Sequence, residues 1–351
     1  MRKSMMAIGM AAVMAFGLMG CGGGAPKQSE APATEAKTEA APAETKAEAA
    51  DTKTEPAGGE AADKKVKVGV SLFNKDQFFA NQEKAMLEYA KQFPNLEIVS
   101  FDAQNDMQKQ MEHINTFASQ KYDVIILSAV NTDTAEEMIG MAGDIPMIFT
   151  NRLPAETVFR KGKDAYVGSE ETDSGRLQGE YLAGVFKDSG KTELNVVMIM
   201  GQLGLDNTTK RTASAKKALE DAGYKLNMVF EDTAEWDRAK AMSKMEQVLG
   251  TGKPIDCVIA NNDEMALGAM EALKAVDKLK DVQVVGLDAT DNALQAIKDG
   301  EMGMTVFQDA ASQAQKAIDL AMEAASGKEI ETMNWIPFTA ITKDNVDEFI
   351  K

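Results

Sequence analysis

Residues 122–128 of this chain read YDVIILS, and this short stretch decides the fold. Its consecutive aliphatic residues predict a strand that is covered on both faces, as strands of parallel sheets are. Toward the amino terminus, strand patterns at Val66–Leu72 and Leu96–Phe101 alternate with helical patterns at Phe79–Gln92 and Met107–Ser119. This alternation predicts a doubly wound α/β lobe.

The same alternation starts again after Ala165–Gly168. Strand patterns at Asn195–Gly201, Leu226–Phe230, Cys257–Asn261 and Val282–Leu287 are separated by helical patterns. The predicted fold class is therefore α/β, with two doubly wound parallel-sheet lobes.

Polar side chains gather where the predicted strands end. In open α/β sheets, ligands bind beyond the carboxyl ends of the strands, so the joint position of these side chains predicts a cleft between the lobes. Taken singly, each is more often a turn or helix-cap residue. The residues are Asp76, Asn151, Arg152, Asn262, Asp263, Asp288 and Gln308.

The composition argues against several classes of protein. The chain carries 55 acidic and 38 basic residues, for a net charge of −17, whereas nucleic-acid binding depends on basic residues. With one His and two Cys, a metal site built from imidazoles or thiolates alone is excluded. A Ser-His-Asp or Cys-His site would depend on His113, which lies in the predicted helix Met107–Ser119 and reads as structural. We expect no enzyme, no metal, no cofactor and no nucleic-acid partner.

The amino-terminal residues predict export and a membrane anchor. Residues 1–20 combine Arg2 and Lys3 with a short apolar stretch, as in a signal peptide, and Leu18-Met19-Gly20-Cys21 resembles the bacterial lipobox. That resemblance implies a lipidated Cys21 at the start of the mature chain; the alternative is an ordinary secretory signal with an incidental cysteine. Residues 21–64 form the predicted tether, because 25–64 contain no large apolar residue and have nothing to bury. A minority interpretation of the Ala/Glu/Lys content is transient helix.

Four runs carry a resemblance to a known family. They read FDAQND at 101–106, TAEWD at 233–237, VIANNDEMALGA at 258–269 and VVGLD at 284–288. Over essentially all of 65–351 the chain resembles type I periplasmic sugar-binding proteins of ABC transporters. It is most similar to the galactose and glucose binders and has some ribose-binder features.

The resemblance implies two lobes joined by a hinge of three crossings. Lobe one would comprise 65–167 plus 310–342, and lobe two 172–306 plus 344–351. The crossings would fall near Gly168–Glu171, near Phe307–Asp309 and near Lys343. Such lobes close around their ligand by hinge motion.

The resemblance also assigns roles in sugar binding. Carboxylates accept hydrogen bonds from sugar hydroxyls, Arg donates in a fixed fork, and aromatic rings cover the C–H faces. Phe78 and Trp236 match the two aromatic walls. The matched polar residues are Asp76, Asn151, Arg152, Asn207, Arg211, Asn262, Asp288 and Gln308.

The chain departs from the galactose binders in two loops. Leu205 and Asn207 stand where those proteins have His and Asp, so an apolar Leu205 predicts weaker discrimination against pentoses and 6-deoxy sugars. The calcium loop of the galactose binders has no match, since Lys187–Thr192 is too poor in spaced oxygen ligands for calcium.

The resemblance implies a monomeric, extracytoplasmic receptor, lipid-anchored to the outer face of the plasma membrane or in the periplasm. It would bind a glucose- or galactose-type aldose and deliver it to an ABC permease. The alternatives are a pentose or 6-deoxy sugar as ligand, or a sensory role in which the same lobes present the sugar to a chemoreceptor or sensor kinase. A sugar-responsive repressor with the same lobes is disfavoured, because it would need an amino-terminal helix-turn-helix where this chain has the predicted leader and tether.

Overall fold

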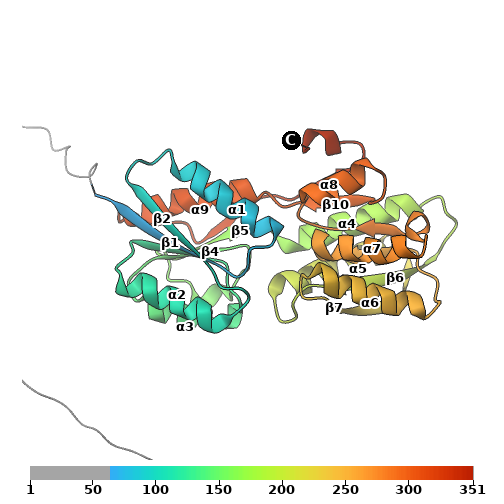
Figure 1. Cartoon of the computed structure of the whole chain (residues 1–351), viewed down its shortest axis with the longest axis horizontal. Coiled ribbons are helices and arrows are strands. Elements are labelled where there is room, and N and C mark those ends of the chain that lie inside the picture. The colour runs from blue at the N-terminus through green and yellow to red at the C-terminus, as the bar shows by residue number, and fades with distance from the viewer. Residues whose placement is uncertain (1–63, 351) are drawn as a thin grey trace, which may run out of the picture. The chain divides into compact units, whose positions relative to one another are not determined.

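The computed structural model of the chain describes residues 64–350, all of which belong to one compact unit. The predicted signal peptide, Cys21 and the tether up to residue 63 lie outside the described residues. The described chain forms two α/β lobes, each built on a six-stranded sheet (Figure 1).

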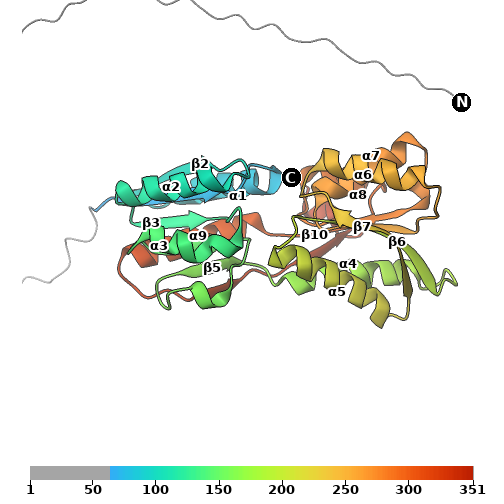
Figure 2. The same ribbon diagram turned by 90° about the horizontal axis from the view of Figure 1, so that it is seen from below.

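The sheet of lobe one is parallel and has the strand order β11-β5-β4-β3-β1-β2. Helices α1 and α9 pack together, as do α2 and α3, so each face of the sheet is covered by a pair (Figure 2). The strands are β1 (Val66–Leu72), β2 (Leu96–Asp102), β3 (Val124–Leu127), β4 (Met147–Thr150), β5 (Ala165–Gly168) and β11 (Met333–Trp335). The helices are α1 (Gln77–Ala90), α2 (Met107–Ser119), α3 (Ala135–Ala142) and α9 (Ala310–Ala325).

The sheet of lobe two has the order β12-β10-β9-β8-β6-β7 and is parallel except for β12, which runs antiparallel to β10. Helix α4 packs on α5, and α6 packs on α7. The strands are β6 (Glu193–Met200), β7 (Lys225–Thr233), β8 (Cys257–Ala260), β9 (Gln283–Val285), β10 (Met304–Phe307) and β12 (Thr339–Thr342). The helices are α4 (Glu171–Phe186), α5 (Asp206–Asp221), α6 (Arg238–Gly250), α7 (Asp263–Ala275) and α8 (Asp291–Lys298).

The chain passes between the two sheets three times, and one passage differs from the prediction. The first lies between β5 and α4, and the second between β10 and α9. The third lies at 336–338, between β11 and β12, and not near Lys343. Residues 339–342 therefore belong to lobe two, because β12 pairs with β10 in the register Phe307↔Thr339 to Met304↔Thr342.

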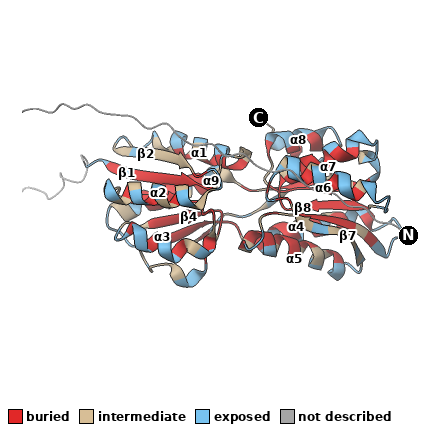
Figure 3. Cartoon of the chain, turned by 60° about the horizontal axis from the view of Figure 1, so that its bottom comes forward, coloured by how far each residue is buried: buried red, intermediate tan, exposed pale blue. Residues whose placement is uncertain are grey.

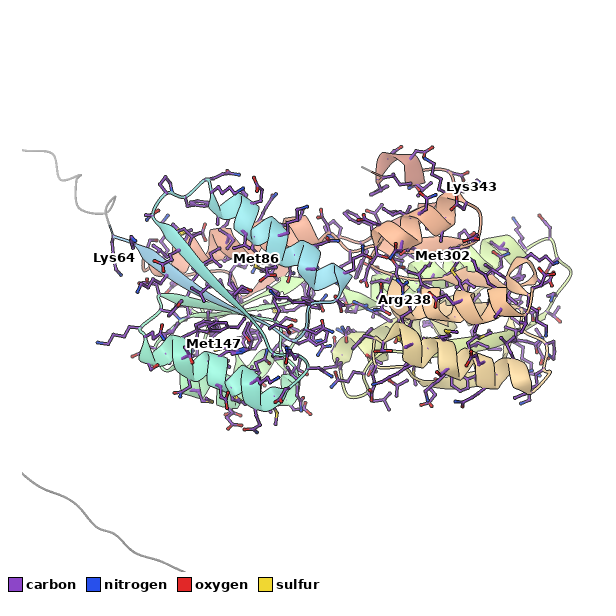
Figure 4. All side chains as sticks on the ribbon, viewed as in Figure 1. Lys64, Met86, Met147, Arg238, Met302 and Lys343 are labelled. Atoms are coloured by element: carbon purple, nitrogen blue, oxygen red, sulfur yellow. The ribbon has the colours of Figure 1, made fainter. Side chains whose placement is uncertain are left out.

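The cores explain why the aliphatic runs form central strands. Every residue of β3 and β8 is buried, while the helices bury one face and expose the other (Figure 3). Methionines serve as packing residues: Met86 and Met147 in lobe one and Met302 in lobe two are all buried (Figure 4). Burying one such side chain contributes roughly 1.5–3 kcal/mol. None of the helices in the described part of the chain is long and apolar enough to span a membrane.

Candidate functional site

All ten predicted site residues line a single pocket. Lobe one contributes Asp76, Phe78, Asn151 and Arg152; lobe two contributes Asn207, Arg211, Trp236, Asn262 and Asp288; Gln308 comes from the second crossing. Two residues that the sequence analysis missed, Phe73 and Phe79, complete the lining.

Asp76 and Asn262 are at once helix caps and pocket residues. Asp76 Oδ1 accepts from Phe79 N (3.0 Å) at the start of α1, and Asn262 Oδ1 accepts from Met265 N (3.0 Å) at the start of α7. Each cap uses one oxygen. Both residues also line the pocket, so the cap interpretation and the binding interpretation are compatible at both positions.

Arg211 is fixed from behind by a buried carboxylate. Its Nε lies 2.6 Å from Glu171 Oε2 and its Nη2 lies 2.9 Å from Glu171 Oε1, and both side chains are only 3% exposed. Nη1 donates to Asn261 O (2.9 Å). Three of the five guanidinium N–H groups are thereby used, which leaves two for the pocket. Burial is the largest single influence and lowers the pKa of Arg211, but the charge and hydrogen bonds of Glu171 and the charge of Asp288 together outweigh it and raise that pKa.

Arg152 is held by backbone carbonyls and an aromatic ring. Nη1 donates to Ala129 O and to Val130 O, both at 3.0 Å. The guanidinium lies 3.4 Å from the centroid of the Phe73 ring, so Phe73 supports Arg152 by a cation–π contact. Burial lowers the pKa of Arg152 to about 9, with Asp76 opposing the shift, so Arg152 remains charged at neutral pH.

The two pocket carboxylates have raised pKa values. Burial is the main cause for Asp76, opposed by the Phe79 backbone N–H and by Arg152. Burial also raises the pKa of Asp288 well above its usual range; Asp263 and Asp76 raise it further, whereas Arg211 lowers it. No hydrogen bond to the Asp288 carboxylate comes from residues 64–350.

Trp236 forms a buried wall of the pocket. It adopts a positive φ of 67° and its indole ring packs on Gly201, where a Cβ atom would overlap the ring. The Arg211 guanidinium lies 5.6 Å from the ring centroid. Two buried donors of the lining, Trp236 Nε1 and Gln308 Nε2, have no hydrogen-bond partner among the described residues. Buried donors of this kind are costly unless a ligand or water accepts from them.

On the lobe-one side, Asn151 is held through its backbone. It has a φ of 62°, a left-handed conformation that Asn tolerates better than most residues. Its carbonyl accepts from Tyr166 Oη (3.0 Å), and Tyr166 is fully buried. A side chain at Gly168 would overlap this hydroxyl. Phe78 packs edge-on against Phe79 at a centroid distance of 5.1 Å.

Three residues singled out in the sequence lie away from the pocket lining. Leu205 precedes α5, is 3% exposed and is not among the residues that line the pocket. His113 Nδ1 lies 3.0 Å from Ser71 Oγ within lobe one, and Cys257 is buried in β8. In residues 64–350, no group of three or more His, Cys, Asp or Glu is placed to hold a metal.

Comparisons with known proteins agree with this architecture. A family model described as a periplasmic binding protein domain matches residues 68–329. A protein of Rhizobium meliloti named for rhizopine binding is 38% identical over 278 residues, covering 78% of this chain and 89% of that protein. The D-galactose/methyl-galactoside-binding periplasmic protein of Haemophilus influenzae is 30% identical over 311 residues, covering 83% and 93%. An ABC transporter solute-binding protein from Bacillus halodurans, solved with bound myo-inositol, has a TM-score of 0.76 at 39% identity and covers 82% of this chain and 98% of its own.

Proposed function

Because this chain belongs to the periplasmic binding protein family, we propose that it is the extracytoplasmic sugar-binding receptor of an ABC transporter and delivers its ligand to the permease. The observation that carries the proposal is the convergence of the ten predicted residues on one pocket lined by both lobes. The relatives are named for solute binding, and we propose no enzymatic role.

The chemistry of the lining suits a small, neutral ring with many hydroxyls. Asp76 and Asp288 are acceptors for hydroxyl protons, whereas Arg211, Trp236 Nε1 and Gln308 Nε2 are donors to hydroxyl oxygens. The aromatic residues cover the apolar faces of the ring.

Within this class we propose a six-membered ring, with myo-inositol preferred. The structure with bound myo-inositol is 39% identical to this chain, against 30% for the galactose-binding relative. The second candidate is the glucose- or galactose-type aldose of the sequence analysis, which the galactose-binding relative favours. The pentose or 6-deoxy alternative of the sequence analysis rested on Leu205, which is not among the residues that line the pocket.

Isothermal titration calorimetry with myo-inositol, glucose, galactose, xylose and ribose tests the proposal. We expect myo-inositol to bind at least about tenfold tighter than the others, a difference of about 1.4 kcal/mol. A hexose that binds tighter than myo-inositol would refute the cyclitol preference and leave the receptor role standing. If none of the five binds, the sugar-binding role itself is wrong.

We also propose that the receptor is held on the membrane by a lipid on Cys21. The support is the lipobox resemblance of 18–21 and the polar composition of 25–64, which suits a spacer between the membrane and the lobes. Two or more acyl chains are sufficient for stable anchoring.

A further inference from the structure

Asp288, which lines the pocket, lies in a strained turn. Asp288 has a φ of 126° and the next residue, Ala289, a φ of 58°. Two consecutive non-glycine residues with positive φ persist only where the surrounding structure over-determines them. The contacts that hold this turn therefore decide where the Asp288 carboxylate lies.

Each backbone N–H of the turn has a specific acceptor. Asp288 N donates to Val306 O (2.8 Å) on the neighbouring strand β10. Ala289 N donates to the hydroxyl of Thr305 (3.2 Å), and Thr290 N donates to Asp263 Oδ2 (2.9 Å). Two of the three acceptors are side chains, so the shape of the turn depends on residue identity at 263 and 305.

Asp263 links these contacts into one network. Its Oδ1 accepts from Thr305 Oγ1 (2.7 Å), and its Oδ2 also accepts from Thr290 Oγ1 (3.3 Å). Its own backbone N–H donates to Leu287 O (2.7 Å), immediately before the turn. Asp263 and Thr305 are fully buried and lie outside the pocket lining. Asp263 is thus bonded to both ends of the turn without facing the ligand.

We propose that Asp263, acting with Thr305, is a positioning residue for ligand binding: it holds the turn 288–290 so that the Asp288 carboxylate faces the pocket. This inference rests on the proposed function for its ligand. It also gives separate roles to the three polar residues that follow β8. Asn261 accepts from Gly201 N, Asn262 lines the pocket, and Asp263 holds the neighbouring turn.

The network has an electrostatic consequence as well. The charged groups facing Asp288 are Asp263 from α7, Arg211 from α5, Asp76 from the β1–α1 connection and Glu171 from α4. Burial raises the pKa of Asp263, and the charge of Glu264 raises it further. Replacing Asp263 by a neutral residue removes one of the charges that raise the pKa of Asp288, so that pKa should fall.

The test compares Asp263→Asn, Thr305→Val and Thr305→Ser with a matched control, Asp256→Asn. Asp256 immediately precedes β8, whereas Asp263 follows that strand at the start of α7. Asp256 is also a buried carboxylate that accepts from a backbone N–H, that of Asn195 (2.7 Å). The first measurement is amide hydrogen exchange in the ligand-free protein. We expect exchange at Ala289 and Thr290 to accelerate at least about tenfold in Asp263→Asn and Thr305→Val, and to stay near wild type in Thr305→Ser and Asp256→Asn.

The second measurement is affinity for myo-inositol, or for the aldose that binds wild type tightest, as a function of pH. We expect about tenfold weaker binding in Asp263→Asn and Thr305→Val, and wild-type affinity in Thr305→Ser. In Asp263→Asn only, the loss of affinity at acid pH should shift to lower pH. If Asp263→Asn does not fold, the two Thr305 variants decide. Unchanged exchange at 289 and 290, or an equal loss of affinity in Asp256→Asn, would overturn the inference. Absence of ligand binding by wild type would overturn only the proposed function, since the exchange experiment needs no ligand.

Discussion

Replacing Glu171 by Ala should destabilise the protein more than any exposed charge deletion on the same helix. Glu171 is the first residue of α4 and makes a bidentate pair with Arg211, and both side chains are 3% exposed. Removing one partner of a buried pair leaves the other charge uncompensated, at a cost of about 3–5 kcal/mol. Because the charge of Asp288 also stabilises the Arg211 guanidinium, we expect a loss of unfolding free energy at the lower end of this range, about 3 kcal/mol. A domain stability is only about 5–15 kcal/mol, so the effect is large.

Urea unfolding followed by far-UV circular dichroism measures this loss as a lower midpoint at an unchanged slope. Glu180→Ala on the same helix is the control, because Glu180 pairs with Arg176 where both side chains are about half exposed (54% and 47%). Such surface pairs contribute about 0–1 kcal/mol. Glu171→Gln retains an acceptor oxygen but not the charge, and should lose roughly half as much as Glu171→Ala. If Glu171→Ala and Glu180→Ala unfold within about 0.5 kcal/mol of each other, Glu171 does not compensate Arg211 as described.

Ligand should change the fluorescence of a Trp335→Phe variant, because Trp236 lines the pocket while Trp335 is 44% exposed on β11. A fluorescence response that survives only in Trp236→Phe would contradict the position of Trp236 in the binding site. Gly201→Ala should weaken ligand binding at least about tenfold in calorimetry, since the new methyl group overlaps the Trp236 ring, and wild-type affinity would show that the ring position does not matter. Cys21→Ala should leave the protein uncleaved or released from membranes on detergent partitioning; a correctly cleaved mutant that stays on membranes argues against the anchor. Burial raises the pKa of Asp263 to about 6 from an ordinary 3.8, so its contribution to stability is full below pH 3.8 and is lost as the pH rises through 6. The unfolding free energy of wild type should accordingly fall relative to Asp263→Asn over that range, and parallel pH profiles would be inconsistent with the shift.

The sequence was most informative where local signals decide the structure. The strand Val66–Leu72 and the helix Met107–Ser119 have the predicted bounds. The helix is fixed by an apolar stripe and by a cap, in which Asp106 accepts from the backbone N–H groups of Gln108 and Lys109. The pocket residues were found together because the carboxyl ends of parallel strands meet at one edge of a sheet.

Features that depend on distant pairing were not predictable in this way. The bounds of lobe two were misplaced because β12 is recognisable only through its pairing with β10. Leu205 was assigned to the pocket from its place in a loop, but the packing of the lobe turns its side chain inward. Glu171 had no predicted role, and Asp263 was predicted only as one of the polar residues at the strand ends. Both lie outside the pocket lining and act through another residue, which the sequence does not reveal.

The pairing of β5 with β11 has a consequence for how the chain acquires its structure. Tyr166 pairs with Met333, so β5 acquires its outer neighbour only after α4 to α8 and the first five strands of lobe two have been synthesised. Until residue 335 is available, β5 is an unpaired sheet edge, which can recruit strands from other molecules. Contacts of such large sequence separation slow folding. A chain that ends before Met333 lacks both β11 and β12 and leaves β5 and β10 as unpaired edges. It should therefore retain the pocket lining and still aggregate, because solubility depends on two short strands that contribute no residue to the pocket.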